Sequence, residues 1–159
     1  MKRLVCITND LLQQVAESAR SSDRRRKNHN FHPADDSRCH RLLNAIEPDS
    51  YIRPHRHLDP EKDEAFVLMS GRLGVIAFDD QGNPVETVVL SRENGVLAID
   101  IPHGLFHTAV SLESGTIFYE TKAGPYLPLK PEEAAPWAPL DSDPDAPAYL
   151  ERLRSLLIS

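Results

Sequence analysis

The chain has 159 residues, of which 40% are hydrophobic and 26% are charged, so it is long and apolar enough for one globular domain with a single core. This balance excludes a disordered chain. The formal net charge of −6 argues against a nucleic acid or an anionic membrane as a partner.

Other features of the whole sequence predict a cytoplasmic protein. Cys6 and Cys39 are its two cysteines, and they are too far apart for a disulfide framework or a paired-thiolate zinc motif. The first ten residues turn polar after a short apolar run, unlike a signal peptide, and no apolar run has the length of a membrane span. A reducing compartment is therefore expected. The local basic run at residues 24–27 predicts a solvated turn, with contact to a phosphate-bearing ligand as the alternative.

The chain begins with a predicted helix and an irregular arm, which together span residues 1–38. Thr8 or Asn9 can cap the helix. Its apolar stripe, at helical spacing, consists of Leu11, Leu12, Val15, Ala16 and Ala19. Residues 20–38 are polar and predict no regular element.

Residues 39–124 predict an all-β unit. Short apolar runs are separated by turn sequences such as DDQGN, RENG and LESG, which favours an antiparallel sandwich or barrel. The predicted strands are Cys39–Ile46, Tyr51–His57, Glu64–Ser70, Arg72–Phe78, Val85–Leu90, Val96–Ile101, His107–Leu112 and Thr116–Lys122.

Residues 125–159 predict a proline-rich wrap followed by a last helix. Proline cannot pair deep in a sheet, so the wrap is expected on the outside of the barrel. The helix is expected at Ala148–Ile158, where leucines recur at helical spacing. The arm, the barrel and the wrap are interpreted as parts of one structural domain.

A histidine pair precedes the third predicted strand. In a strand His55 and His57 would point to the same side. Two buried imidazoles need partners for their nitrogens, and a divalent cation satisfies both at once. An edge strand with both rings in water is an equally good interpretation of this pair alone.

Glu64 and His107 extend the pattern. Glu64 shares the alternation of Phe66, and a carboxylate at the start of a buried strand is costly unless it is paired or bound to a metal. His107 opens a later strand and would complete a site of three imidazoles and one carboxylate. The rival carboxylates in the preceding loop are Asp59, Glu61 and Asp63, and His103 in the later turn is expected to face solvent.

These residues resemble the two motifs of the cupin superfamily. The first motif is carried by His55, His57, Glu64 and Gly71, and the second by Pro102, Gly104 and His107. The gap from His57 to Glu64 is longer than usual, and Ser111 stands where the second motif often has Asn.

The stretches RRRKNHNFHP, RLLNAIEPDSYIRPHRHLDPEKDEAF, GRLGVIAFDDQG, IDIPHGLFHTAV, KAGPYLPL and APWAP resemble the WbuC family of cupin-fold metalloproteins over nearly the whole chain. The resemblance implies a double-stranded β-helix (jelly-roll) barrel with a bound metal and an association with bacterial polysaccharide gene clusters. It also implies a homodimer, because cupins often pair through their barrel faces. It does not imply a defined reaction.

The candidate ligands His55, His57, Glu64 and His107 suit a divalent transition metal, namely Fe, Mn, Ni, Co or Zn, and leave coordination positions open. Candidate catalytic residues beside such a metal are Arg53, Glu120, Lys122 and Tyr126. Arg41 and Asn44 lie on opposite faces of their strand, so only one of them is expected to face inward. Asn30 and His32 are interpreted either as a lid or as caps of a turn.

Three functional hypotheses follow for a small-molecule ligand. The first is a metal-dependent isomerase or epimerase acting on a sugar or sugar nucleotide. The second is a cupin that binds or senses a small polar ligand without turnover. The third is an iron-dependent dioxygenase.

Overall fold

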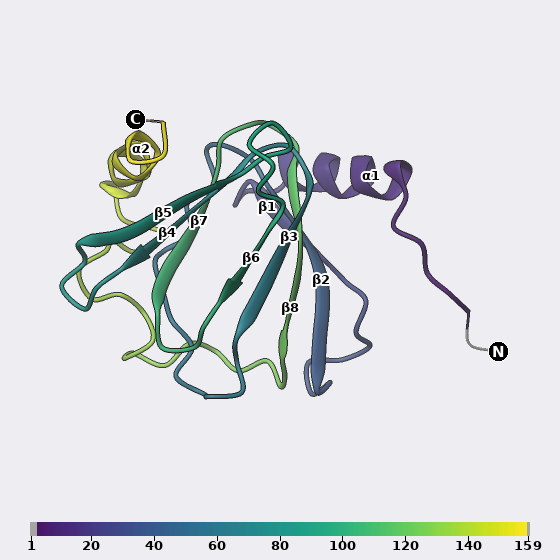
Figure 1. Cartoon of the computed structure of the whole chain (residues 1–159), viewed down its shortest axis with the longest axis horizontal. Coiled ribbons are helices and arrows are strands. Elements are labelled where there is room, and N and C mark those ends of the chain that lie inside the picture. Colours follow the sequence, from purple (N-terminus) through teal and green to yellow (C-terminus); the bar gives the residue numbers. More distant parts are fainter. Residues whose placement is uncertain (1–2, 159) are drawn as a thin grey trace.

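The computed structural model describes residues 3–158, which form two antiparallel sheets that open against each other like a wedge, with one helix beside each sheet (Figure 1). One sheet has five strands in the order β1-β2-β8-β3-β6, and the other has three in the order β5-β4-β7. The strands are β1 (Arg26–Asn30), β2 (Cys39–Ile46), β3 (Glu64–Ser70), β4 (Leu73–Phe78), β5 (Pro84–Leu90), β6 (Ala98–Ile101), β7 (Phe106–Ser111) and β8 (Thr116–Ala123). The helices are α1 (Asn9–Arg20) and α2 (Ala146–Ser155).

The space between the sheets is apolar at one end and polar at the other. Alternation along β3 buries Glu64, Phe66 and Leu68 on the same face. The apolar end is a core of buried side chains from both sheets: Ile46, Phe66, Leu68, Leu73, Val75, Leu90, Ile101, Ala109 and Phe118. Glu64 and His107 lie toward the polar end, where the interior contains a cavity that apolar side chains do not fill.

The two helices cover the outer faces of the sheets and leave the interior free. Helix α1 is capped by Thr8, whose hydroxyl oxygen accepts a hydrogen bond from the backbone N–H of Leu11 at 3.2 Å. It buries Val15 and Ala19 in a core shared with Leu43 of β2. Helix α2 is part of the other outer core, in which Leu150, Leu153 and Leu157 pack with Ile76 and Val110.

Two sequence predictions about secondary structure are wrong. Residues 20–38 were expected to be irregular, but β1 forms within them and pairs with β2. Its sequence RKNHN is polar at every position, so no apolar alternation marks it as an edge strand. The strand expected at Tyr51–His57 does not form, because Pro54 lacks a backbone N–H and a continuous ladder is interrupted. Only His55 pairs in this segment, through isolated bridges to His107 and Ala134.

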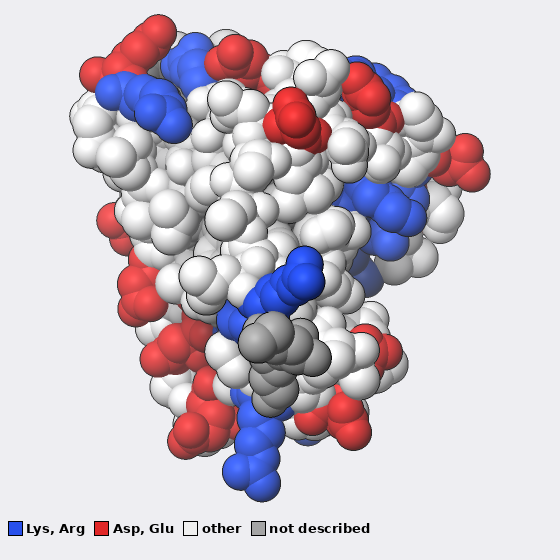
Figure 2. All heavy atoms as spheres, turned by 90° about the vertical axis from the view of Figure 1, so that its right-hand side faces the viewer, with Lys and Arg blue, Asp and Glu red and all other residues white. Residues whose placement is uncertain are grey.

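The last helix forms near its predicted position, at Ala146–Ser155 rather than 148–158. On the face of the molecule that carries α1, acidic side chains gather along one edge and basic side chains stand in separate groups (Figure 2). Within residues 3–158, no helix is both long enough and apolar enough to cross a membrane.

Candidate metal centre

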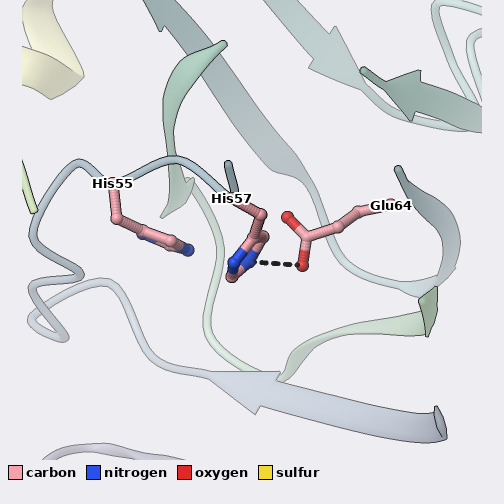
Figure 3. Close-up of side chains that lie close together, drawn as sticks. All are labelled: His55, His57 and Glu64. Carbon is pink, nitrogen blue, oxygen red and sulfur yellow. Dashed lines mark ion pairs between the residues drawn. The ribbon is translucent and has the colours of Figure 1, made fainter. Parts of the chain in front are cut away.

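Side chains from three separate segments converge at the polar end of the interior. His55 and His57 come from the loop before β3, Glu64 is the first residue of β3, and His107 lies in β7. Potential ligand atoms of His55, His57 and Glu64 all lie within 4.8 Å of one another, and their side chains point toward a common region (Figure 3). The His107 ring joins them, with its centroid 4.8 Å from that of His55.

Backbone carbonyls fix the orientation of two of the rings. The Nδ1 atom of His55 lies 3.1 Å from the carbonyl oxygen of Arg53, and that of His107 lies 3.0 Å from the carbonyl oxygen of Leu105. A carbonyl only accepts, so Nδ1 carries the proton in both rings and the Nε2 lone pair is left for a ligand. This tautomer suits metal binding through Nε2.

The inner atoms of the cluster are close together but poorly matched as hydrogen-bond partners. The Nε2 atom of His107 lies 2.9 Å from Oε2 of Glu64, and Nε2 of His57 lies 3.3 Å from Oε1. Both Nε2 atoms and Oε2 of Glu64 are buried without an aligned hydrogen bond among the described residues. A lone pair on His107 Nε2 facing a carboxylate is repulsive unless a cation lies between them. The donor set therefore fits a divalent metal.

A second polar group lies directly beside Glu64 because of strand register. Lys122 of β8 pairs with Glu64, and Glu120 is the next residue on the same face. The Lys122 ammonium lies 2.9 Å from Oε1 of Glu64 and 2.7 Å from Oε1 of Glu120. Asn44 of β2 donates its side-chain amide to Oε2 of Glu120. These four residues form a continuous buried polar network across three strands.

Burial and these neighbours set the charge states. Burial, reinforced by the neighbouring His107, lowers the pKa of His55 to about 3, so this ring is neutral and able to bind a metal. Burial alone would raise the pKa of Glu64, but the adjacent His107 and His57 rings and the charge of Lys122 hold this pKa well below its usual range. Burial raises the pKa of Glu120 against the opposing effect of Lys122. The pKa of Lys122 is raised because Glu120 and Glu64 outweigh its own burial.

The C-terminal wrap holds the histidine loop in place, a role that the sequence did not reveal. The Glu133 carboxylate accepts a hydrogen bond from the backbone N–H of Leu58 at 2.9 Å and another from that of Lys130 at 2.9 Å. The backbone of Ala135 donates to the carbonyl of Pro54 at 3.0 Å, and Gly104 donates to the carbonyl of His57 at 2.7 Å. The loop is therefore fixed from both sides, by the wrap and by the turn that precedes β7.

The cluster borders a cavity of about 740 Å³, whose lining includes each of its members except His57. His55, Glu64 and His107 line it together with Glu120 and Lys122. Its apolar walls are formed by Ile46, Ile52, Phe66, Ala109, Phe118 and Leu129, and its remaining polar lining includes Asn44, Arg53 and the segment at residues 22–28.

The structure brings most, but not all, of the predicted catalytic residues to this cavity. Arg53, Glu120 and Lys122 line it. Tyr126 is 59% exposed and lines a smaller adjoining pocket of about 310 Å³, which shares Glu120 and Lys122 with the main cavity. Tyr126 therefore faces the network from a different side than the metal cluster.

The remaining alternatives from the sequence are resolved by position. Asn44 faces inward and Arg41 is exposed.

His32 is buried and its Nδ1 atom lies 3.2 Å from both the backbone N–H and the carbonyl oxygen of Arg41, which fits a structural role in the turn. His103 is exposed, as expected, and pairs with Asp63 at 2.8 Å, so Asp63 is engaged outside the cluster. Asp59 and Glu61 are exposed, which leaves Glu64 as the carboxylate of the cluster.

Comparison with solved structures defines the class of fold. KdgF from Halomonas sp. is similar with a TM-score of 0.51 and 18% identity, over 67% of this chain and 85% of that one. A cupin superfamily protein from Desulfitobacterium hafniense is similar with a TM-score of 0.51 and 9% identity, over 69% of this chain and 86% of that one. The fold is therefore a double-stranded β-helix, as in these two proteins. This confirms the fold class predicted from the sequence.

At the level of the family, residues 7–90 match the model described as "Domain of unknown function (DUF6016)", and the chain belongs to this family. No protein in the curated set matches this sequence.

Proposed function

We propose that the protein is a metal-dependent enzyme of the isomerase or epimerase type that acts on a sugar or sugar nucleotide in bacterial polysaccharide metabolism. The observation that carries this proposal is the arrangement at the end of the cavity. Three imidazoles and one carboxylate, that of Glu64, face one region. A second buried carboxylate, Glu120, is linked to Glu64 through the Lys122 ammonium. The resemblance of the sequence to the WbuC family supports the link to polysaccharides.

The metal would be held by the Nε2 atoms of His55, His57 and His107 and by the Glu64 carboxylate. A bound divalent ion with open positions would polarise a carbonyl or a pair of hydroxyl groups of the substrate. Imidazole and carboxylate ligands suit Fe, Mn, Ni, Co and Zn alike.

Glu120 is the proposed proton acceptor and donor. Its carboxylate is buried between the Lys122 ammonium and the Asn44 amide, which fix its orientation, and it borders the cavity that contains the cluster. The Lys122 ammonium would stabilise negative charge that develops on the substrate oxygen. The apolar walls around Phe66 and Phe118 would exclude water and strengthen these interactions.

The test is proton exchange at carbon during turnover. Metal-loaded protein is incubated in deuterated water with nucleotide sugars and keto-sugars, and products are followed by NMR. We expect conversion with deuterium entering the carbon next to a carbonyl, and we expect Glu120→Gln to lower kcat by at least about 100-fold, in line with the typical contribution of a general base. A metal-loaded protein that leaves every compound unchanged and undeuterated would refute the proposal. Tight binding of an unaltered compound would point instead to a non-catalytic ligand-binding cupin.

A further inference from the structure

Part of the cavity wall outside the metal cluster is rich in basic side chains, although the chain as a whole is acidic. Arg24, Arg26, Lys27 and Arg53 line the cavity in this region, against the carboxylates of Asp23 and Asp141. The first three follow α1 in the run that leads into β1, and Arg53 precedes the histidine pair. Their concentration contrasts with the net charge of −6 for the whole chain. Four cations against two carboxylates give this part of the lining a net positive charge, which attracts anionic ligands.

Arg26 and Asp141 largely neutralise each other, so neither is free for a ligand. The Arg26 guanidinium lies 2.7 Å from Oδ2 of Asp141 and donates to the carbonyl oxygen of Tyr51 at 2.7 Å. Its side chain is 14% exposed. This pair joins β1 to the C-terminal segment and is structural.

Arg24 and Lys27 remain available at the edge of the cavity. The Arg24 side chain is 70% exposed and reaches Asp141 only at 3.9 Å. Lys27 is exposed and forms no ion pair within residues 3–158. Exposed and weakly paired cations at the edge of a cavity lose little when they rearrange around an anion.

Arg53 provides a third cation, closer to the cluster. One terminal nitrogen donates to the carbonyl oxygen of Ala135 at 2.6 Å, which anchors the guanidinium. No residue of the described chain accepts a hydrogen bond from the other terminal nitrogen. The carbonyl of Arg53 also orients His55, so the backbone of this arginine is in direct contact with the metal cluster. A planar guanidinium held in this way is suited to bind phosphate or carboxylate oxygens.

We propose that this cavity binds an anionic substituent of the substrate, a phosphate ester or a carboxylate, between Arg53 and the exposed pair Arg24 and Lys27. The inference rests on the proposed function, because it assigns the opposite end of the same substrate to the metal cluster. A cavity of about 740 Å³ is within the range for ligands larger than one sugar ring, so it has room for both ends. The substrate class is therefore a charged sugar derivative and not a neutral sugar.

The test compares matched ligands by titration calorimetry on metal-loaded protein at low salt. The ligands are a hexose, the corresponding hexuronic acid and the corresponding hexose phosphate, with inorganic phosphate as a fourth probe. We expect at least one charged sugar to bind at least about tenfold tighter than the neutral hexose, and the comparison of uronate with phosphate identifies which anion is preferred. The double variant Arg24→Ala/Lys27→Ala is expected to lose about tenfold in affinity for that sugar without loss of metal. The control variant is Arg92→Ala, which removes an exposed arginine outside the cavity.

Equal affinities for charged and neutral sugars, or no binding of any charged probe, would overturn the inference. So would an equal loss in the Arg92→Ala control. Because phosphate also binds metals directly, the titration is repeated on metal-free protein, where the effect of the double variant must persist. Anion binding that depends on Arg24 and Lys27, without turnover of any sugar, would keep this site and refute the enzyme proposal. Turnover of neutral sugars with no preference for charge would support the enzyme proposal and refute the anion site.

Discussion

Glu64 contacts three other residues of the candidate site. Its two carboxylate oxygens lie near His57, His107 and Lys122, while only 2% of the residue is exposed. A buried carboxylate in contact with three nitrogen groups is stable only if enough positive charge is present. Lys122 supplies one charge, but it is shared with Glu120. A divalent ion would leave both carboxylates fully compensated.

Removal of one imidazole tests this residue-scale account. His107→Ala is expected to weaken binding of a divalent metal by more than about 100-fold, because direct ligands contribute more than the 10–100-fold typical of their supporting partners. His103→Ala is the control, since His103 lies in the turn before β7, is exposed and pairs with Asp63. Calorimetric metal titration gives the affinities. Equal metal affinities for the two variants would remove His107 from the site.

Lys122→Met tests the charge balance of the buried network. The substitution leaves Glu64 and Glu120 without their shared cation, which is expected to cost about 3–5 kcal/mol in the free energy of unfolding of the metal-free protein. Added metal is expected to restore part of this loss, because it neutralises Glu64. Urea denaturation with and without metal measures both effects, with Lys130→Met at an exposed lysine as control. A metal-free variant as stable as the wild type would show that the two carboxylates do not share a charged lysine.

At the scale of elements, the histidine loop depends on the C-terminal wrap. Glu133→Ala removes the acceptor for the backbone N–H groups of Leu58 and Lys130. We expect the free energy of unfolding to fall by about 1–3 kcal/mol, as for a buried hydrogen-bonded group, and metal affinity to fall by about tenfold. Glu132→Ala, at the exposed neighbouring position, is the control. Unchanged metal affinity in the Glu133 variant would mean that the loop holds its shape without the wrap.

The success of the sequence prediction differed between elements for physical reasons. The bounds of β2 and β3 were predicted correctly, because a buried face imposes a clear apolar pattern on each. Strand β1 was missed because an edge strand of five polar residues has no such pattern. The segment with the histidine pair is held by isolated bridges, by backbone hydrogen bonds to Glu133 and Ala135 and by the Glu133 carboxylate, and local sequence does not encode such distant partners.

The candidate site was more predictable than its surroundings. Glu64 was identified because a carboxylate in register with Phe66 has to lie inside the barrel. Glu120 and Lys122 were placed on one face by the same alternation, and the structure shows them in contact. Tyr126 was expected beside the metal but lines the adjoining pocket, because it follows the end of β8 in an irregular segment with no periodicity. The role of Glu133 could not be predicted from the sequence, since this residue lies in a proline-rich run with no periodic pattern.

For the whole molecule, the helices cover the outer faces of the two sheets and the interior is left for a ligand (Figure 1). Metal binding inside such a shell is linked to folding, because the ligands converge only in the folded chain. Metal at 100 times its dissociation constant is expected to raise the free energy of unfolding by about 2.7 kcal/mol. Thermal or urea denaturation at increasing metal concentration measures this gain. A similar gain in the His107→Ala variant would place the stabilising ion elsewhere.

The most direct measurement is the metal content of protein purified without added metal, combined with a crystal structure of that same preparation. The account predicts about one divalent transition metal ion per chain, with His55, His57, His107 and Glu64 donating from about 2.0–2.3 Å. A metal-free protein that takes up no ion on addition, with Glu64 still bound to Lys122 and the three rings turned apart, would contradict it.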